Sequence, residues 1–138
     1  MPQTKILMIE DNSSDVFLLR RALNAVHKDF ELEIAADGDQ ALRFIHNGGG
    51  QKEAHPCVIL LDLHLPKHDG LEILHAIRQN PNLKHVHVMV TTNAASPREA
   101  EELRRMGIEC RPKPRDLEGV QRLATDLIAI CNGSEISA

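Results

Sequence analysis

The sequence predicts an α/β fold: a parallel sheet of five strands, doubly wound with helices on both faces in a (βα)₅ arrangement. Apolar runs of strand length alternate five times with segments whose apolar residues recur at helical spacing. Such alternation folds as a parallel sheet, because each crossover helix packs back onto a face of the sheet. The 138 residues have the size of one domain, which we assign to 1–132, with a flexible tail at 133–138.

The strands are recognised by short apolar runs between polar or turn-forming residues. KILMIE and CVILL are almost continuously apolar, as expected of buried strands, whereas ELEIAA alternates in part. HVMVT is rich in β-branched residues, and IECR is short and weak. The predicted strands are 5–10, 31–36, 57–61, 87–91 and 108–111.

The helices are recognised by their period and by their start signals. Asp37 with Gln40, and Ser96 with Glu99, have the spacing of capping boxes, and Pro97 suits a first helical position. The predicted helices are 14–28, 38–47, 69–80, 96–106 and 116–130.

The first and last helices need separate remarks. Asn12 or Ser13 can cap the first one, and Asp15 suits the positive end of its dipole. The last helix has an apolar stripe that we expect to face the sheet, formed by Leu117, Val120, Leu123 and Leu127.

Composition argues against several classes of protein. A net charge of −4 and a pI near 6.0 give no basic footprint for nucleic acid or for an anionic membrane. No apolar run approaches transmembrane length. Three distant cysteines, Cys57, Cys110 and Cys131, fit reduced thiols and form neither a disulfide framework nor a CxxC pattern. We therefore expect a cytoplasmic protein without nucleic-acid or membrane partners.

Polar residues follow the strands on one side of the predicted sheet. Glu10 and Asp11 follow the first strand, Asp62 the third, Thr91 ends the fourth and Lys113 follows the fifth. Ligands of open parallel sheets bind beyond the carboxyl ends of the strands, where these side chains should converge. An aspartate directly after four apolar residues is costly to bury unless its charge is compensated.

The chemistry of this set favours a hard cation and phosphate. Clustered carboxylates repel one another, and oxygen ligands without thiolates favour Mg²⁺. A carboxylate nucleophile, a cation and fixed donors are the parts that phosphoryl transfer requires. We therefore interpret Asp62 as a phosphate acceptor whose charge is made tolerable by Mg²⁺ and Lys113.

Five motifs together resemble a bacterial response-regulator receiver domain: Glu10-Asp11, the run 62–66 (DLHLP), Asp69-Gly70, Thr91 and Lys113-Pro114. The resemblance covers essentially the whole chain. It implies a CheY-like (flavodoxin-like) three-layer sandwich with strand order 2-1-3-4-5. The loop 48–56 and the phrases HLPKHDG and VTTNA are most similar to small stand-alone receivers that serve phytochrome-type histidine kinases.

The resemblance also implies roles at the predicted site. Asp62 would be phosphorylated by a sensor histidine kinase or a histidine phosphotransfer protein. Asp11, Asp62 and the backbone carbonyl of His64 would ligate Mg²⁺ directly, and Glu10 would act through water. Thr91 and Lys113 would bind the phosphoryl group.

The resemblance further implies a cis peptide between Lys113 and Pro114, which would aim the ammonium at the pocket. One position departs from the family pattern: three residues before the lysine, where receivers usually carry Tyr or Phe, this chain has Cys110. A thiol is too small to act as a ring-sized plug, so the route of output is open. We also expect the His64 side chain to overhang the pocket and to affect hydrolysis of the acyl phosphate.

The function that follows is a stand-alone response regulator, a phospho-acceptor rather than an enzyme, which signals by binding another protein. It would be a monomer or a phosphorylation-dependent homodimer, and could also relay its phosphoryl group onward. The alternative is an aspartate-dependent phosphatase on a similar sheet. Such phosphatases typically carry DxD, whereas this chain has Asp62-Leu63-His64. A flavin or nucleotide binder is disfavoured because the acidic turn EDNSSD would repel phosphate.

Overall fold

The computed structural model describes residues 4–27, 29–47 and 55–133, in which five strands alternate with five helices. Every element lies within two residues of its predicted range. The strands are β1 (Thr4–Ile9), β2 (Phe30–Ala35), β3 (Val58–Asp62), β4 (His87–Thr92) and β5 (Glu109–Pro112). The helices are α1 (Ser13–Val26), α2 (Gly38–His46), α3 (Gly70–Gln79), α4 (Pro97–Met106) and α5 (Leu117–Cys131).

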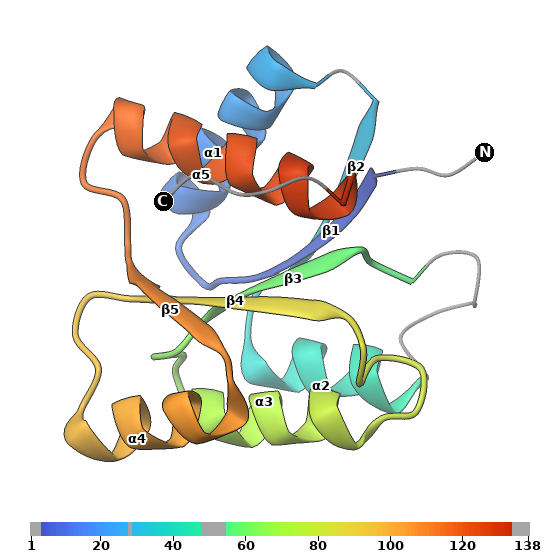
Figure 1. Cartoon of the computed structure of the whole chain (residues 1–138), viewed down its shortest axis with the longest axis vertical. Coiled ribbons are helices and arrows are strands. Elements are labelled where there is room, and N and C mark those ends of the chain that lie inside the picture. The colour runs from blue at the N-terminus through green and yellow to red at the C-terminus, as the bar shows by residue number, and fades with distance from the viewer. Residues whose placement is uncertain (1–3, 28, 48–54, 134–138) are drawn as a thin grey trace.

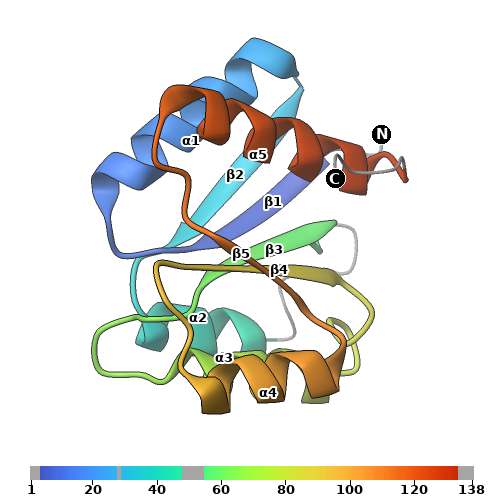
Figure 2. The same cartoon turned by 60° about the vertical axis from the view of Figure 1, so that its left-hand side comes forward.

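The strands form one parallel sheet in the order β2-β1-β3-β4-β5, as predicted. Helices α1 and α5 cover one face, and α2, α3 and α4 cover the other (Figure 1, Figure 2). Because β1 and β3 are central, the loops that follow them meet at the carboxyl edge of the sheet. None of the helices in the described part of the chain has the length and apolarity needed to cross a membrane.

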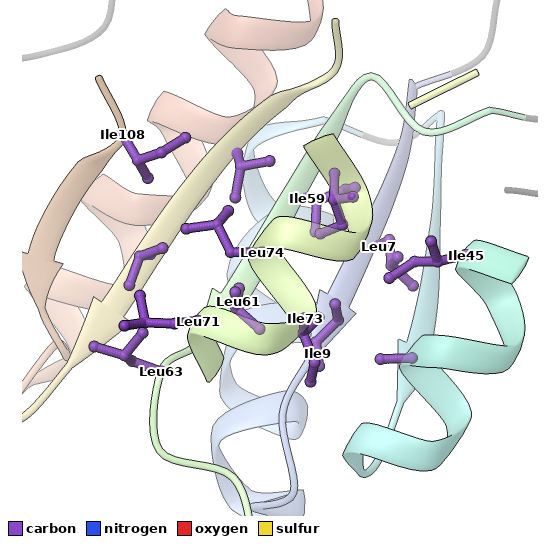
Figure 3. Close-up of a cluster of buried hydrophobic side chains, with 14 of the residues drawn as sticks. Leu7, Ile9, Ile45, Ile59, Leu61, Leu63, Leu71, Ile73, Leu74 and Ile108 are labelled. Carbon is purple, nitrogen blue, oxygen red and sulfur yellow. The ribbon is translucent and has the colours of Figure 1, made fainter. Parts of the chain in front are cut away.

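Each face of the sheet has its own hydrophobic core. Successive residues of a strand point to opposite faces, so Leu61 joins the core under α3 while Leu60 joins the core under α1 and α5. Figure 3 shows the first of these cores, where Ile73 and Leu74 of α3 lie over the strands. All five residues of β3 are buried, which explains its continuous apolar run. Burial of each large aliphatic side chain contributes about 1.5–3 kcal/mol.

Helix caps agree with the sequence except at one side chain. Asn12 caps α1, and Ser96 and Glu99 form a complete capping box at α4. Asp37 caps α2 as predicted, but the Gln40 side chain accepts from the backbone N–H of Ala36 rather than from that of the cap. This bond closes the turn between β2 and α2 instead of completing a capping box.

Leu117 was predicted to face the sheet, and that prediction is wrong: its side chain is 71% exposed. It occupies the first position of α5, one turn before Val120 and Leu123 reach the core. The periodic stripe therefore begins one turn before the helix meets the sheet. The assigned tail lies outside the described residues beyond 133.

The expectation of reduced thiols is contradicted by a disulfide between Cys57 and Cys131. Cys57 directly precedes β3 and Cys131 ends α5, and their Cα atoms lie 5.2 Å apart. The two residues are separated by 74 positions in sequence, so only the packing of α5 along the sheet brings them together. Cys110 is free and exposed.

Candidate functional site

Asp62 ends β3, where its side chain is 5% exposed. Its register partner on the neighbouring strand is Thr91, 4% exposed, so the two side chains leave the sheet on the same face. Glu10 directly follows β1, the other neighbour of β3, and is 4% exposed. The parallel topology thus gathers side chains from distant parts of the sequence at one edge.

Glu10, Asp11 and Asp62 form an acidic cluster in which one oxygen from each residue lies within 4.8 Å of the others. Two of these carboxylates are buried, and Asp11 is exposed. Burial raises the pKa of Glu10 from 4.5 to about 7; the negative charge of Asp62 also raises it, while the hydrogen bond from Lys113 lowers it. The cluster therefore carries more negative charge than one ammonium compensates, which fits a site for a divalent cation with oxygen ligands.

Lys113 enters this cluster from the end of β5. Its Nζ lies 3.0 Å from Glu10, 3.2 Å from Asp15 and 3.3 Å from Asp62. Burial alone would lower the pKa of the ammonium, but the hydrogen bond to Glu10 and the charges of Asp62 and Glu10 outweigh burial and raise it. Lys113 is therefore a permanent cation at this edge of the sheet.

The peptide between Lys113 and Pro114 is trans, so the implied cis bond is a wrong prediction. The ammonium reaches the carboxylates without it, because the Lys113 N–H donates to the Thr92 carbonyl and continues the pairing of β5 with β4. This pairing, together with the length of the side chain, is what aims Nζ at the cluster.

Asp15 is a residue of the site that sequence reasoning missed. The pattern assigned it to the dipole of α1, and it does lie in the first turn of that helix. Its Oδ2 also contacts Lys113, 98 residues away. The available signal was its position: it lies in the first turn of the helix that follows β1, so it stays near the edge where the strands end.

The loop between β3 and α3 turns tightly around Asp62. The N–H of His64 donates to Asp62 Oδ1 at 3.1 Å, which fixes one carboxylate oxygen. Lys67 adopts a left-handed conformation with φ of 72°. A Cβ on Gly70 would overlap the backbone of Leu63, so glycine is required there. The Asp69-Gly70 motif therefore shapes the loop that carries the acceptor.

The side chain of His64 bridges this loop to α4. Its Nε2 donates to Glu99 Oε1 at 3.1 Å, and its Nδ1 lies 3.3 Å from Thr92 Oγ1. Burial would raise the pKa of Glu99, but the Ser96 backbone N–H and His64 lower it. His64 also lines a cavity beside Asp62, as we expected. Its ring is held toward α4 by the hydrogen bond to Glu99. Partial burial of the Cys110 thiol raises its pKa, and the negative charge of Glu99 raises it further.

Two cavities of about 550 Å³ each open beside the cluster and share Lys113. Asp11, Asp62 and His64 line one of them, and Glu10 and Thr91 line the other. All predicted site side chains are thus brought to one edge of the sheet. The arrangement can bind a hard cation against carboxylates and an anion against the ammonium, with Asp62 at the boundary between them.

Comparison with known proteins gives the same picture. Residues 6–119 match the family described as response regulator receiver domain. The chain is 42% identical over 94 residues to the response regulator Rcp1 of Synechocystis sp., and 37% identical over 102 residues to the probable methanogenesis regulatory protein FilR2 of Methanothrix harundinacea. These alignments cover 67% and 72% of this chain. They span 64% and 63% of the two relatives, somewhat less than two thirds of each.

Solved structures agree over the whole fold. The phosphorylated cyanobacterial phytochrome response regulator RcpA superposes with a TM-score of 0.81 at 27% identity, covering 99% of both chains. The Mn²⁺-bound form of Rcp1 superposes with a TM-score of 0.78 at 31% identity, covering 98% of this chain and 99% of that one. The order of the strands, the carboxyl-edge cluster and the family match over residues 6–119 lead to one conclusion: the chain belongs to the response regulator receiver domain family.

Proposed function

We propose that this chain is a phosphorylation-dependent signalling switch in which Asp62 accepts a phosphoryl group. The observation that carries the proposal is the position of Asp62: a buried carboxylate held between the Lys113 ammonium, 3.3 Å away, and two further acids. A carboxylate oxygen attacks the phosphorus of a phosphohistidine, the P–N bond breaks, and the leaving imidazole keeps the electron pair and takes a proton from solvent. The product is an acyl phosphate on Asp62.

Each neighbouring residue has a role in this proposal. Asp11 and Asp62, with the His64 carbonyl, would hold Mg²⁺ directly, and Glu10 would do so through water. The bound cation supplies positive charge to the phosphoryl oxygens. Lys113 donates to those oxygens, and Thr91 donates a further hydrogen bond from the adjacent strand. The donor set contains oxygen alone, which is the chemistry that Mg²⁺ prefers.

We further propose a sensor histidine kinase or a histidine phosphotransfer protein as the donor, with a phytochrome-type kinase favoured. RcpA is described as a cyanobacterial phytochrome response regulator, and its fold matches 99% of this chain. The protein would act in the cytoplasm as a monomer or a phosphorylation-dependent homodimer, and its output would be binding to another protein. The phosphatase alternative has less support, because the residue two positions after Asp62 is His64, whose ring is engaged with Glu99.

The test is phosphorylation by a small donor. Incubation with Mg²⁺ and phosphoramidate, followed by intact mass measurement, should add one phosphoryl group to the wild type and to Asp39→Asn, an exposed acid on α2. Asp62→Asn should gain none, and a chelator should prevent the gain in the wild type. An equal gain on Asp62→Asn would refute the assignment of the acceptor. Rapid turnover of small phosphate esters would favour the phosphatase instead.

A further inference from the structure

Asp15 contacts Lys113 but stands apart from the acidic cluster. The Lys113 ammonium has three N–H donors and faces three carboxylates, at 3.0, 3.2 and 3.3 Å. Two of these carboxylates, Glu10 and Asp62, belong to the cluster, whereas Asp15 does not. Asp15 can therefore keep its partner when a cation is bound to the other acids.

The three contacts also differ in exposure. Glu10 and Asp62 have side chains 4% and 5% exposed, whereas the Asp15 side chain is 40% exposed. An exposed carboxylate loses little free energy when its ion pair breaks, because water replaces the ammonium. Of the three contacts, the one with Asp15 is therefore the least costly to exchange. Asp15 and Lys113 line the same cavity as Thr91, so exchange can occur where an anion would bind.

We propose that Asp15 is a positioning residue for the phosphoryl transfer: it holds the Lys113 ammonium before phosphorylation and competes with the phosphoryl oxygens for it afterwards. The inference rests on the proposed function of Asp62. When the acyl phosphate forms, one N–H of Lys113 passes from Asp15 Oδ2 to a phosphoryl oxygen. Asp15 thereby weakens the retention of the phosphoryl group.

This role predicts that removing the Asp15 carboxylate raises the affinity for an analogue of the phosphoryl group. Asp15→Asn takes away a competing anion and leaves the carboxylates of the cluster in place. It should bind beryllofluoride, an analogue of the phosphoryl group, about threefold to tenfold more tightly in the presence of Mg²⁺. The affinity for Mg²⁺ alone should change less than twofold, since Asp15 is outside the cluster. Asp15→Glu keeps the charge and should restore the wild-type affinity for beryllofluoride.

The experiment is isothermal titration calorimetry of the full chain with beryllofluoride, at fixed Mg²⁺, and with Mg²⁺ alone. Glu118→Gln is the matched control: it removes an acid from the first turn of α5 whose partner is Arg122, at 3.4 Å, rather than Lys113. It should leave both affinities unchanged. Asp15→Ser, a second uncharged variant, should repeat the effect of Asp15→Asn.

The outcomes separate the inference from the function on which it rests. If the wild type binds beryllofluoride and both uncharged variants bind it equally or more weakly, the role of Asp15 is refuted while the role of Asp62 stands. The role would also be refuted if Asp15→Asn changed the affinity for Mg²⁺ alone as much as the affinity for beryllofluoride, because Asp15 would then act on the metal site in general. If the wild type neither binds beryllofluoride nor gains mass from phosphoramidate, the proposed function itself fails.

Discussion

Replacing Glu10 by Gln should remove a pH dependence of stability that the buried carboxylate creates. The pKa of Glu10 rises from 4.5 to about 7 on folding, so the folded protein keeps a proton that the unfolded chain has already released. The stabilisation from this proton is fully present below pH 4.5 and is lost as the pH rises toward 7. Without a divalent cation, the contribution of Glu10 therefore makes the protein less stable at pH 7.5 than at pH 4.5.

The magnitude follows from the size of the shift. A change from 4.5 to about 7, at about 1.4 kcal/mol per pKa unit, corresponds to roughly 3 kcal/mol of unfolding free energy. The side chain is 4% exposed, so water does little to screen it. Glutamine has a similar shape but does not ionise, so Glu10→Gln should lack this contribution.

Urea denaturation of both proteins between pH 4.5 and 8, with a chelator present, measures the effect. The difference in unfolding free energy between the variant and the wild type should grow by roughly 3 kcal/mol over this range. Taking the difference cancels the pH-dependent contributions that the two proteins share. Parallel pH profiles for the two proteins would refute the reasoning. Added Mg²⁺ should reduce the growth of this difference, because a cation beside Glu10 favours its ionised form.

Three further substitutions test other features. Gly70→Ala forces a Cβ into the backbone of the β3–α3 loop and should lower the unfolding free energy by about 2 kcal/mol or more in urea melts. An unchanged unfolding free energy would mean that the loop has room for the Cβ. Asp126→Ala removes a 1% exposed carboxylate from Arg111, 2.8 Å away, and should cost about 2–3 kcal/mol in the same assay; less than 1 kcal/mol would contradict a structural ion pair. His64→Ala breaks the link to Glu99, so amides at the start of α4 should exchange with deuterium about threefold to tenfold faster. Unchanged exchange would show that the capping box alone holds this helix end.

The fold could be predicted because local signals agreed with one another. Continuous apolar runs marked the central strands, and the Ser96-Pro97-Glu99 start of α4 has the geometry that its spacing predicts. The site followed from topology, since a parallel sheet brings strand ends to one edge whatever their distance in sequence. Glu10, Asp62 and Lys113 were therefore expected together, and they are together.

Other features depend on packing that no local pattern encodes. The disulfide joins Cys57 to Cys131 because the end of α5 lies over the start of β3, a consequence of the whole sheet. Leu117 fits the apolar stripe of its helix, but it lies in the part of α5 that precedes the contact with the sheet. Asp15 has an ordinary local explanation at a helix start, and this hid its contact with Lys113.

The covalent tie between Cys57 and Cys131 fastens the final helix to the amino end of the central strand. All the charged groups gathered around Asp62 lie at the opposite end of that strand. The bond therefore restrains α5 at the end that lies farthest from the site. The start of α5, on the side of the molecule where Lys113 meets the carboxylates, is not held by this bond.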